Sequence, residues 1–365
     1  VQLIGTIQAN RHAYLPSDFD ERLYVVGLNG FQVVERLPLG DEVNSVAVSA
    51  DGSVVYLAPS NSAEIRVLDR ASLQFIDSIP LPRPADAITL APGGTQLWVS
   101  SIDVLVLDLE TRQISATIDV PNTPFVVRFP ADGLTAYVGM TGFEETVAII
   151  DAQTATLTDS IRLATDLGDL EVNSAGTVLY ASSNRFVFAY DLQLQAVFDR
   201  IEFEDDVVSM LESRDASLLY VADDSSALSY MSIPANEVLN TVPSASSPRG
   251  IAQDPVSGAV YVVGFLDARL DGFTEQTGAL FGRIAIGNRT WRPGDFAGVP
   301  ILSNLAGRVD NSAALVRFVC ENLDTGQRVT GAPDRDDPRQ WDCTARGLQG
   351  GVGERVRVTL VMRSD

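Results

Sequence analysis

Apolar and polar residues alternate in short runs along most of the chain, and one pattern of runs returns at a nearly constant interval. Residues 13–39 align with residues 55–81 without a gap. Each copy has an aromatic anchor at the same place: Tyr14, Tyr56, Trp98, Tyr137, Tyr180, Tyr220 and Tyr261. Successive anchors are 42, 42, 39, 43, 40 and 41 residues apart. This is the length of a blade of four short strands, so the pattern predicts a seven-bladed β-propeller.

Within each copy, tight turns separate the predicted strands. Four copies have a glycine four residues before the anchor: Gly52, Gly94, Gly133 and Gly176. A tight hairpin needs a residue that accepts a positive φ there, and glycine does so without steric cost. The last two copies have Ala216 and Ser257 instead, so we expect their turns to differ.

The third predicted strand of four copies ends in an aspartate: Asp69, Asp108, Asp151 and Asp191. Each aspartate precedes a short polar turn, where its carboxylate can accept backbone N–H groups. We therefore interpret these residues as turn formers rather than catalytic acids. A fourth strand closes each copy, over residues 31–37, 75–79, 114–118, 157–161, 197–201, 238–242 and 280–284.

The copies stay in phase from the first strand to the last, and no stretch has the pattern of a long amphipathic helix. The fold class is therefore predicted to be all-β. The first copy has its own inner strand near residues 3–7 and the seventh its own outer strand near residues 280–284. We expect the ring to close by packing of the first blade on the seventh, without a blade shared between the two ends of the chain.

Segments such as VAVSADGSVVYLAPSNSAEIRVLDRASLQFIDSIPL and ITLAPGGTQLWVSSIDVLVLDLETRQISATIDV resemble YVTN-type β-propeller repeats. That family is named for a tetrapeptide on the second strand, which here reads VYLA, LWVS, AYVG or LYVA. The resemblance covers residues 1–290 and implies a propeller of the surface-layer or adhesin type. Such repeats also occur in lactonase-like enzymes and in quinoprotein-like dehydrogenase subunits, so the fold leaves the function open.

The period stops near residue 290, and residues 291–298 have the composition of a linker. Residues 299–365 show alternating segments at 314–320, 327–330, 341–345 and 354–362. Cys320 and Cys343, with Trp341 close to the second, resemble the pinned core of a small immunoglobulin-like β module. A disulfide stabilises a module of this size, although two free thiols are the alternative. The module is either self-contained or completed by a strand from a neighbouring chain.

A disulfide would place the protein in an oxidising compartment: extracellular, at the cell surface or periplasmic. The 48 acidic residues outnumber the 26 basic ones, giving a net charge of −22. This charge repels phosphate backbones and argues against a nucleic-acid partner. The acidic surface fits a saline habitat, and the use of Arg in place of Lys also fits a GC-rich genome. No apolar run approaches the roughly 20 residues of a membrane-spanning helix.

Loops that join the fourth strand to the first, and the second to the third, should emerge on one face around the mouth of the channel. Candidate cation-binding acids on this face are Asp41, Glu42, Asp86, Asp166, Asp169, Asp205 and Asp206. Calcium prefers such oxygen ligands, but a solvated acidic rim is the alternative, and no cofactor is otherwise indicated. Arg83 and Arg249 are candidates for holding an anion or, alternatively, for pairing with neighbouring acids.

Catalytic motifs are scarce in this sequence. His12 is the sole histidine, in a predicted turn-to-strand position, so a Ser-His-Asp or Cys-His arrangement is not indicated. Hydrolysis by two carboxylates stays open. We expect a non-enzymatic extracellular or cell-surface platform whose partners are other protein chains. One form is a surface-layer or filament subunit that self-associates through the C-terminal module. The alternative is a lactonase-like hydrolase or a redox-complex subunit that uses the channel.

Overall fold

The computed structural model describes the chain over defined ranges. In the propeller these are residues 12–17, 20–28, 30–142, 146–163, 167–254, 256–266 and 268–285. Beyond it they are residues 299–300, 306–308, 315–322, 327–331, 340–342 and 355–362. In this second group the backbone is described throughout, and side chains only for residues 327–330.

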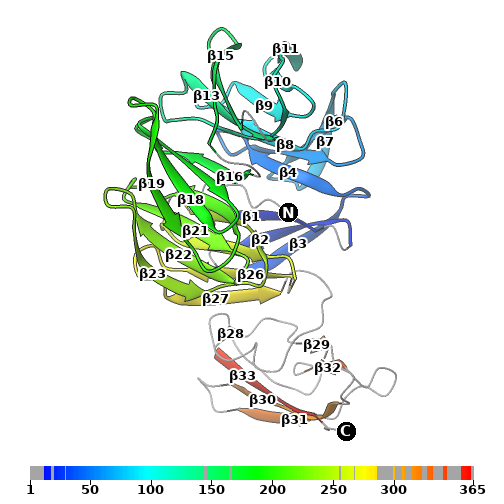
Figure 1. The fold of residues 1–365 in the computed structure, drawn as a ribbon. Helices are drawn as coiled ribbons and strands as arrows, with labels where there is room; N and C mark the ends of the chain where they lie inside the picture. The colour runs from blue at the N-terminus through cyan, green and yellow to red at the C-terminus, as the bar shows by residue number, and fades with distance from the viewer. Residues whose placement is uncertain are drawn as a thin grey trace.

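Seven antiparallel sheets follow one another around a ring, as Figure 1 shows. The first blade contains β1 (His12–Ser17), β2 (Arg22–Gly27) and β3 (Gln32–Pro38). The second contains β4 (Val43–Val48), β5 (Val54–Pro59), β6 (Glu64–Asp69) and β7 (Gln74–Pro80). The third contains β8 (Ala87–Leu90), β9 (Gln96–Ser100), β10 (Val104–Asp108) and β11 (Gln113–Ile118). The fourth contains β12 (Thr123–Arg128), β13 (Thr135–Thr141), β14 (Val147–Asp151) and β15 (Thr156–Ile161).

The remaining three blades have the same order of strands. The fifth contains β16 (Leu167–Val172), β17 (Val178–Ser183), β18 (Phe186–Asp191) and β19 (Ala196–Glu202). The sixth contains β20 (Val207–Glu212), β21 (Leu218–Asp223), β22 (Ala227–Ser232) and β23 (Glu237–Pro243). The seventh contains β24 (Pro248–Gln253), β25 (Val260–Gly264), β26 (Arg269–Phe273) and β27 (Leu280–Ala285).

The prediction of an all-β, seven-bladed propeller with four-stranded blades is confirmed. The described residues contain no helix, and among them no helix is long and apolar enough to cross a membrane. Every anchor is buried. In the second to seventh blades it lies on the second strand, and Tyr14 lies on β1 of the first blade. The predicted innermost strand of the first blade, near residues 3–7, lies outside the described residues.

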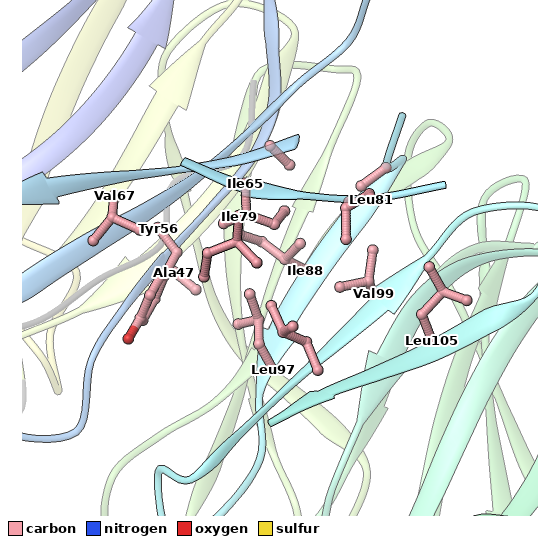
Figure 2. Packing of buried hydrophobic residues seen from close by; sticks show 13 residues of the cluster. Ala47, Tyr56, Ile65, Val67, Ile79, Leu81, Ile88, Leu97, Val99 and Leu105 are labelled. Carbon is pink, nitrogen blue, oxygen red and sulfur yellow. The ribbon is translucent and has the colours of Figure 1, made fainter. Parts of the chain in front are cut away.

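The hydrophobic core is divided into layers between neighbouring blades. In the layer of Figure 2, Tyr56 and Ile65 of the second blade pack with Ile88 and Leu97 of the third. Side chains alternate between the two faces of a strand, so each central strand contributes to the layer on either side of it. Burial of these apolar side chains stabilises the blades against one another.

The aspartates at the ends of the third strands form turns, as predicted. Asp69 Oδ1 accepts the backbone N–H of Ser72 at 2.8 Å, and Asp151 Oδ1 accepts that of Thr154 at 2.8 Å. Side-chain hydroxyls of Ser72 and Thr154 donate to the same oxygens. Each carboxylate is occupied by its own turn, which agrees with a structural role.

The expectation that the turn at Ala216 differs from the glycine turns is wrong. Ala216 adopts φ +57° and donates its N–H to the Ser213 carbonyl at 2.8 Å, as Gly176 does to the Asn173 carbonyl. The rest of the turn imposes the left-handed conformation on alanine despite its steric cost. The seventh blade does differ, because Gly258 takes the positive φ there and donates to the Asp254 carbonyl.

The ring closes by packing of the first blade on the seventh. The seventh blade takes all four of its described strands from residues 248–285, and among the described residues none comes from the first blade. Phe31 of the first blade contacts Tyr261 and Phe281 with ring centroids 5.7 and 5.6 Å apart. A Cβ atom on Gly282 would lie 2.3 Å from the Phe31 ring. Glycine at this position therefore makes room for the aromatic side chain that joins the two ends of the ring.

The C-terminal strands form two sheets. One has the order β28 (Val299–Pro300), β33 (Arg355–Met362), β30 (Leu315–Asn322) and β31 (Arg328–Gly331), and the other pairs β29 (Ala306–Arg308) with β32 (Gln340–Asp342). Cys320 lies on β30, opposite Val329 and Val358. Cys343, and with it the predicted disulfide, lies outside the described residues, as does the predicted linker. The immunoglobulin-like arrangement stays a prediction.

Candidate functional site

A cavity of about 420 Å³ lies among the innermost strands of six blades, β4, β8, β12, β16, β20 and β24. Its position at the centre of the ring follows from the repeat, because each blade brings its first strand to the propeller axis. The volume lies within the range of about 300–1,000 Å³ that is usual for small-molecule sites. The centre of the ring is therefore the candidate functional site.

One side of the cavity is formed by a cluster of three charged side chains. Arg128 at the end of β12 donates from Nη2 to Asp169 Oδ1 at 3.2 Å and from Nε to Glu171 Oε2 at 2.9 Å. Only 25% of the Arg128 side chain, 10% of Asp169 and 12% of Glu171 is exposed. The cluster joins the fourth and fifth blades where they meet the cavity.

Backbone groups of the fifth and sixth blades hold the carboxylates in place. Met210 donates its N–H to Asp169 Oδ2 at 2.7 Å, and Leu170 donates to Asp169 Oδ1 at 2.8 Å. Glu212 donates its N–H to Glu171 Oε1 at 3.3 Å. The charged cluster is therefore fixed by three neighbouring blades, which makes its geometry preorganised.

The two carboxyls share a single guanidinium, and the pKa of each is raised. Burial raises the pKa of Glu171 to about 7; the nearby Arg128 charge opposes this rise and the Asp169 charge adds to it. Burial also raises the pKa of Asp169, opposed by the Arg128 charge and by the N–H donors of Met210 and Leu170. The two carboxyls are therefore a coupled pair, and near neutral pH Glu171 holds a proton in part of the molecules. The folded protein binds this proton more tightly than the unfolded chain. Its stabilising contribution is complete below about pH 4.5 and is lost as the pH rises through 7.

The other walls of the cavity contain both apolar and polar residues. Val48 and Leu90 line it from the second and third blades, and Leu211 and Ile251 line it from the sixth and seventh. The small side chains of Ala47 and Ala252 leave space between them. The arrangement suits a molecule with one polar end and an apolar body.

The structure brings two of the predicted site residues to the cavity. Asp169 belongs to the charged cluster, and Arg249 lines the wall formed by β24. Arg249 also pairs with Asp224, with 3.8 Å between Nη1 and Oδ1, and its guanidinium lies 5.4 Å from the centre of the Phe265 ring. The alternative that Arg249 pairs with a neighbouring acid is thus confirmed.

The other predicted residues do not line the cavity. Asp41 is buried in a loop contact, where it accepts hydrogen bonds from Asn61 Nδ2 at 2.9 Å and Ser62 Oγ at 2.8 Å. Burial alone would raise the pKa of Asp41, but these hydrogen bonds outweigh it and lower the value. Five residues are exposed: Glu42, Arg83, Asp86, Asp205 and Asp206. Asp166 lies outside the described residues, and no described acid forms an ion pair with Arg83.

Calcium binding by the rim acids stays an untested prediction. Within the described ranges, no three His, Cys, Asp or Glu side chains come together in a group that could hold a metal ion. His12, the only histidine in the sequence, begins β1 and is not among the residues that line the cavity.

Sequence reasoning missed Arg128 and Glu171, although the repeat contains a signal for both. In the second to seventh blades, the residue nine positions before the anchor pairs with it from the innermost strand and lines the cavity. These residues are Ala47, Thr89, Arg128, Glu171, Leu211 and Ala252. Two neighbouring blades thus place opposite charges at a position that is otherwise small or apolar.

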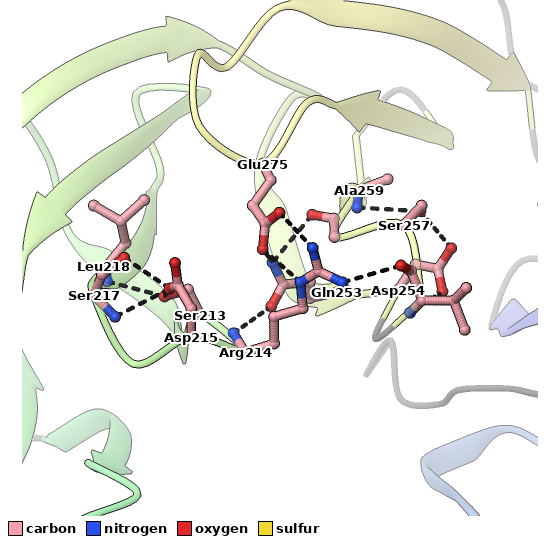
Figure 3. Close-up of polar contacts among 12 residues, drawn as sticks. Ser213, Arg214, Asp215, Ser217, Leu218, Gln253, Asp254, Ser257, Ala259 and Glu275 are labelled. Carbon is pink, nitrogen blue, oxygen red and sulfur yellow. Dashed lines mark hydrogen bonds and ion pairs between the residues drawn. The ribbon is translucent and has the colours of Figure 1, made fainter.

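A second polar cluster lies between the sixth and seventh blades (Figure 3). Arg214 pairs with Glu275 through Nε–Oε1 at 2.7 Å and Nη2–Oε2 at 2.9 Å. Gln253, which also lines the cavity, accepts the Arg214 N–H at 2.7 Å and donates to Glu275 at 3.2 Å. The side chains of Arg214 and Gln253 both bind Glu275, so we assign this cluster a structural role in joining the blades.

Comparison with known proteins supports the architecture. A scan against protein-family models and a search of curated proteins both find no match. Among solved structures, the chain is similar to hydrazine synthase of Kuenenia stuttgartiensis, with a TM-score of 0.65 and 13% sequence identity. The match covers 73% of this chain and 93% of that chain. At this identity the likeness concerns the fold alone, and it agrees with a seven-bladed β-propeller of four-stranded blades.

Proposed function

We propose that this protein is a non-enzymatic binding platform whose channel holds a small organic molecule. The observation that carries the proposal is the cavity of about 420 Å³, with Arg128, Asp169 and Glu171 on one side and a mixture of apolar and polar residues on the others. Fixed polar groups beside apolar residues are typical of ligand sites, because the polar groups orient a ligand and the apolar residues stabilise it.

Catalysis in the same cavity is less well supported than ligand binding. Ser209 contributes a hydroxyl to the lining, but no histidine, cysteine or lysine is among the described lining residues to activate it. The raised pKa of Glu171 would suit a general acid. However, N–H donors from Arg128 and Glu212 hold its two oxygens in place, one donor on each. These contacts favour a fixed charge that orients a ligand.

A thermal-shift screen of the full chain against small amphipathic compounds tests the proposal. A compound present at 100 times its Kd should stabilise the protein by about 2.7 kcal/mol. We expect such stabilisation of the wild type and its loss in Ala252→Leu, which fills part of the cavity. The matched control is Ala196→Leu, the same change at an exposed position on β19. Equal stabilisation of the wild type and Ala252→Leu, or none in either, would contradict the proposal.

Assembly through the C-terminal module is a second candidate function, within an extracellular, cell-surface or periplasmic setting. Its supporting observation is that β31 lies at the edge of its sheet and pairs, among the described strands, with β30 alone. An open edge invites strand addition from another chain. A surface-layer or filament subunit would sediment as a large species at high salt, whereas a protein that stays monomeric at high concentration would exclude it.

Membership of a redox complex is supported only by the shared fold. The similar structure is named as a hydrazine synthase, but the lining of the cavity described here contains no histidine or cysteine, and a single methionine, Met210. Haem and metal cofactors are usually held by such side chains. A small-molecule ligand therefore fits the observed lining better than a metal cofactor does.

A further inference from the structure

We propose that the ligand of the channel carries a positively charged amine on an apolar chain, and that Glu171 is the counter-charge that receives it. This inference rests on the proposed function, since it names the chemical class of molecule that the cavity would take. It follows from the charges around the cavity, the hydrogen-bond capacity of the two carboxylates and the nature of the remaining walls.

The polar side of the cavity has more negative than positive charge. Arg128 is its one cation, and it already contacts both Asp169 and Glu171. Arg249, the other cation in the lining, is close to Asp224 and lies over the Phe265 ring. An anionic ligand would therefore approach a guanidinium that two carboxylates already neutralise. A cation instead meets a cluster whose formal charge is −1 when both carboxylates are ionised.

Glu171 has the larger unused capacity for hydrogen bonds. An ionised carboxylate can accept about four donors. Asp169 accepts N–H groups from Arg128, Leu170 and Met210, whereas Glu171 accepts one from Arg128 and a longer one from Glu212. An ammonium group, which has three donors and no acceptor, therefore fits Glu171 better than Asp169.

The apolar residues in the remaining walls indicate what the ligand carries besides its amine. Val48, Leu90, Leu211 and Ile251 present hydrocarbon to the cavity. An aliphatic or aromatic chain against them gains about 25 cal/mol for each Å² of apolar surface removed from water. A small polar cation without such a chain would lose this contribution, so the inferred class is an amphipathic amine and not a metal ion or a bare ammonium.

Binding of such an amine should depend on pH. Two charged groups act on Glu171, Arg128 on β12 and Asp169 on β16. Glu212 on β20 contacts it through its backbone N–H, and Arg249 on β24 lines the same cavity. Because the pKa of Glu171 is raised to about 7, the carboxylate is mostly protonated at pH 6 and mostly ionised at pH 8. The affinity for a cation should rise with pH across this window, by about tenfold between pH 6 and pH 8.

Calorimetry with three six-carbon probes tests the inference on the full chain: hexylamine, hexanol and hexanoate. At pH 8 we expect hexylamine to bind at least tenfold tighter than the other two. Glu171→Gln should weaken hexylamine binding at least tenfold and remove the pH dependence. The matched control is Glu237→Gln, which removes one carboxylate from an exposed position on β23 and should leave binding unchanged. Circular dichroism on both variants verifies that they are folded.

The possible failures are distinguishable. If hexanol or hexanoate binds as tightly as hexylamine and Ala252→Leu abolishes that binding, the amine assignment is wrong but the channel remains a ligand site. If hexylamine binds Glu171→Gln as tightly as the wild type, Glu171 is not its counter-charge and the inference is overturned. If none of the three probes binds and the thermal-shift screen also finds no compound, both the inference and the proposed function are wrong.

Discussion

Replacing Phe31 by alanine should lower the free energy of unfolding by about 3 kcal/mol, because this side chain joins the two ends of the ring. Truncating a buried phenylalanine costs about 3–5 kcal/mol, and alanine keeps the strain of the φ of +44°, because only glycine adopts this conformation without steric cost. Chemical denaturation of the full chain measures the difference. The matched control is Phe75→Ala on the outermost strand of the second blade, where the side chain is 41% exposed and the loss should be below about 1 kcal/mol.

Gly282, which faces the Phe31 ring, allows a second measurement of the same contact. Gly282→Ala should destabilise the protein by about 1–3 kcal/mol through overpacking, since its Cβ would lie 2.3 Å from the Phe31 ring. In the double variant Phe31→Ala/Gly282→Ala the clash disappears, so the two losses should not add. Fully additive losses, or a loss in Phe31→Ala no larger than in Phe75→Ala, would show that the ring does not close through this contact.

Replacing Arg128 by methionine should cost about 3–5 kcal/mol at pH 8, because it leaves Asp169 and Glu171 buried without a counter-charge. The sign of the pH dependence follows from the raised pKa of Glu171. Without Arg128 the pKa values of both carboxyls rise further, so protonation below them relieves the penalty. The loss should therefore be much smaller at pH 5 than at pH 8, as measured by denaturation at both values.

The control for this prediction removes the charge of the whole cluster. Arg128→Met combined with Asp169→Asn and Glu171→Gln leaves no buried charge at this place and should recover part of the stability that the single variant loses at pH 8. A single variant with equal losses at pH 5 and pH 8 would mean that the carboxylates do not titrate as the cluster geometry requires.

The repeat in the sequence predicts the blades well because an anchor such as Tyr180 or Trp98 has to be buried on the second strand of its blade, whatever the loops contain. The residue types in a turn predict its conformation less reliably than the anchors predict the blades. Ala216 has the wrong side chain for a positive φ, yet the hydrogen bonds around it impose that conformation. The local sequence shows the preference of one residue, whereas the turn depends on the whole hairpin.

The candidate site was harder to predict for a physical reason. Acidic residues are common in the loops of this chain, and exposed ones such as Asp205 resemble ligand residues in sequence. Arg128 and Glu171 instead lie within apolar innermost strands, 43 residues apart, and meet only because neighbouring blades adjoin. Comparing the position nine residues before each anchor would have found them. Their ion pair and the raised pKa of Glu171 depend on burial, which the sequence alone does not give.

A crystal structure of the full chain grown with hexylamine at pH 8 tests the central claim most directly. The account predicts density for the amine in the channel, with its nitrogen at hydrogen-bond distance from Glu171 and its chain against Leu90 and Leu211. A channel that holds only water under these conditions, or an amine bound elsewhere on the propeller, would contradict the claim that this cavity is the ligand site.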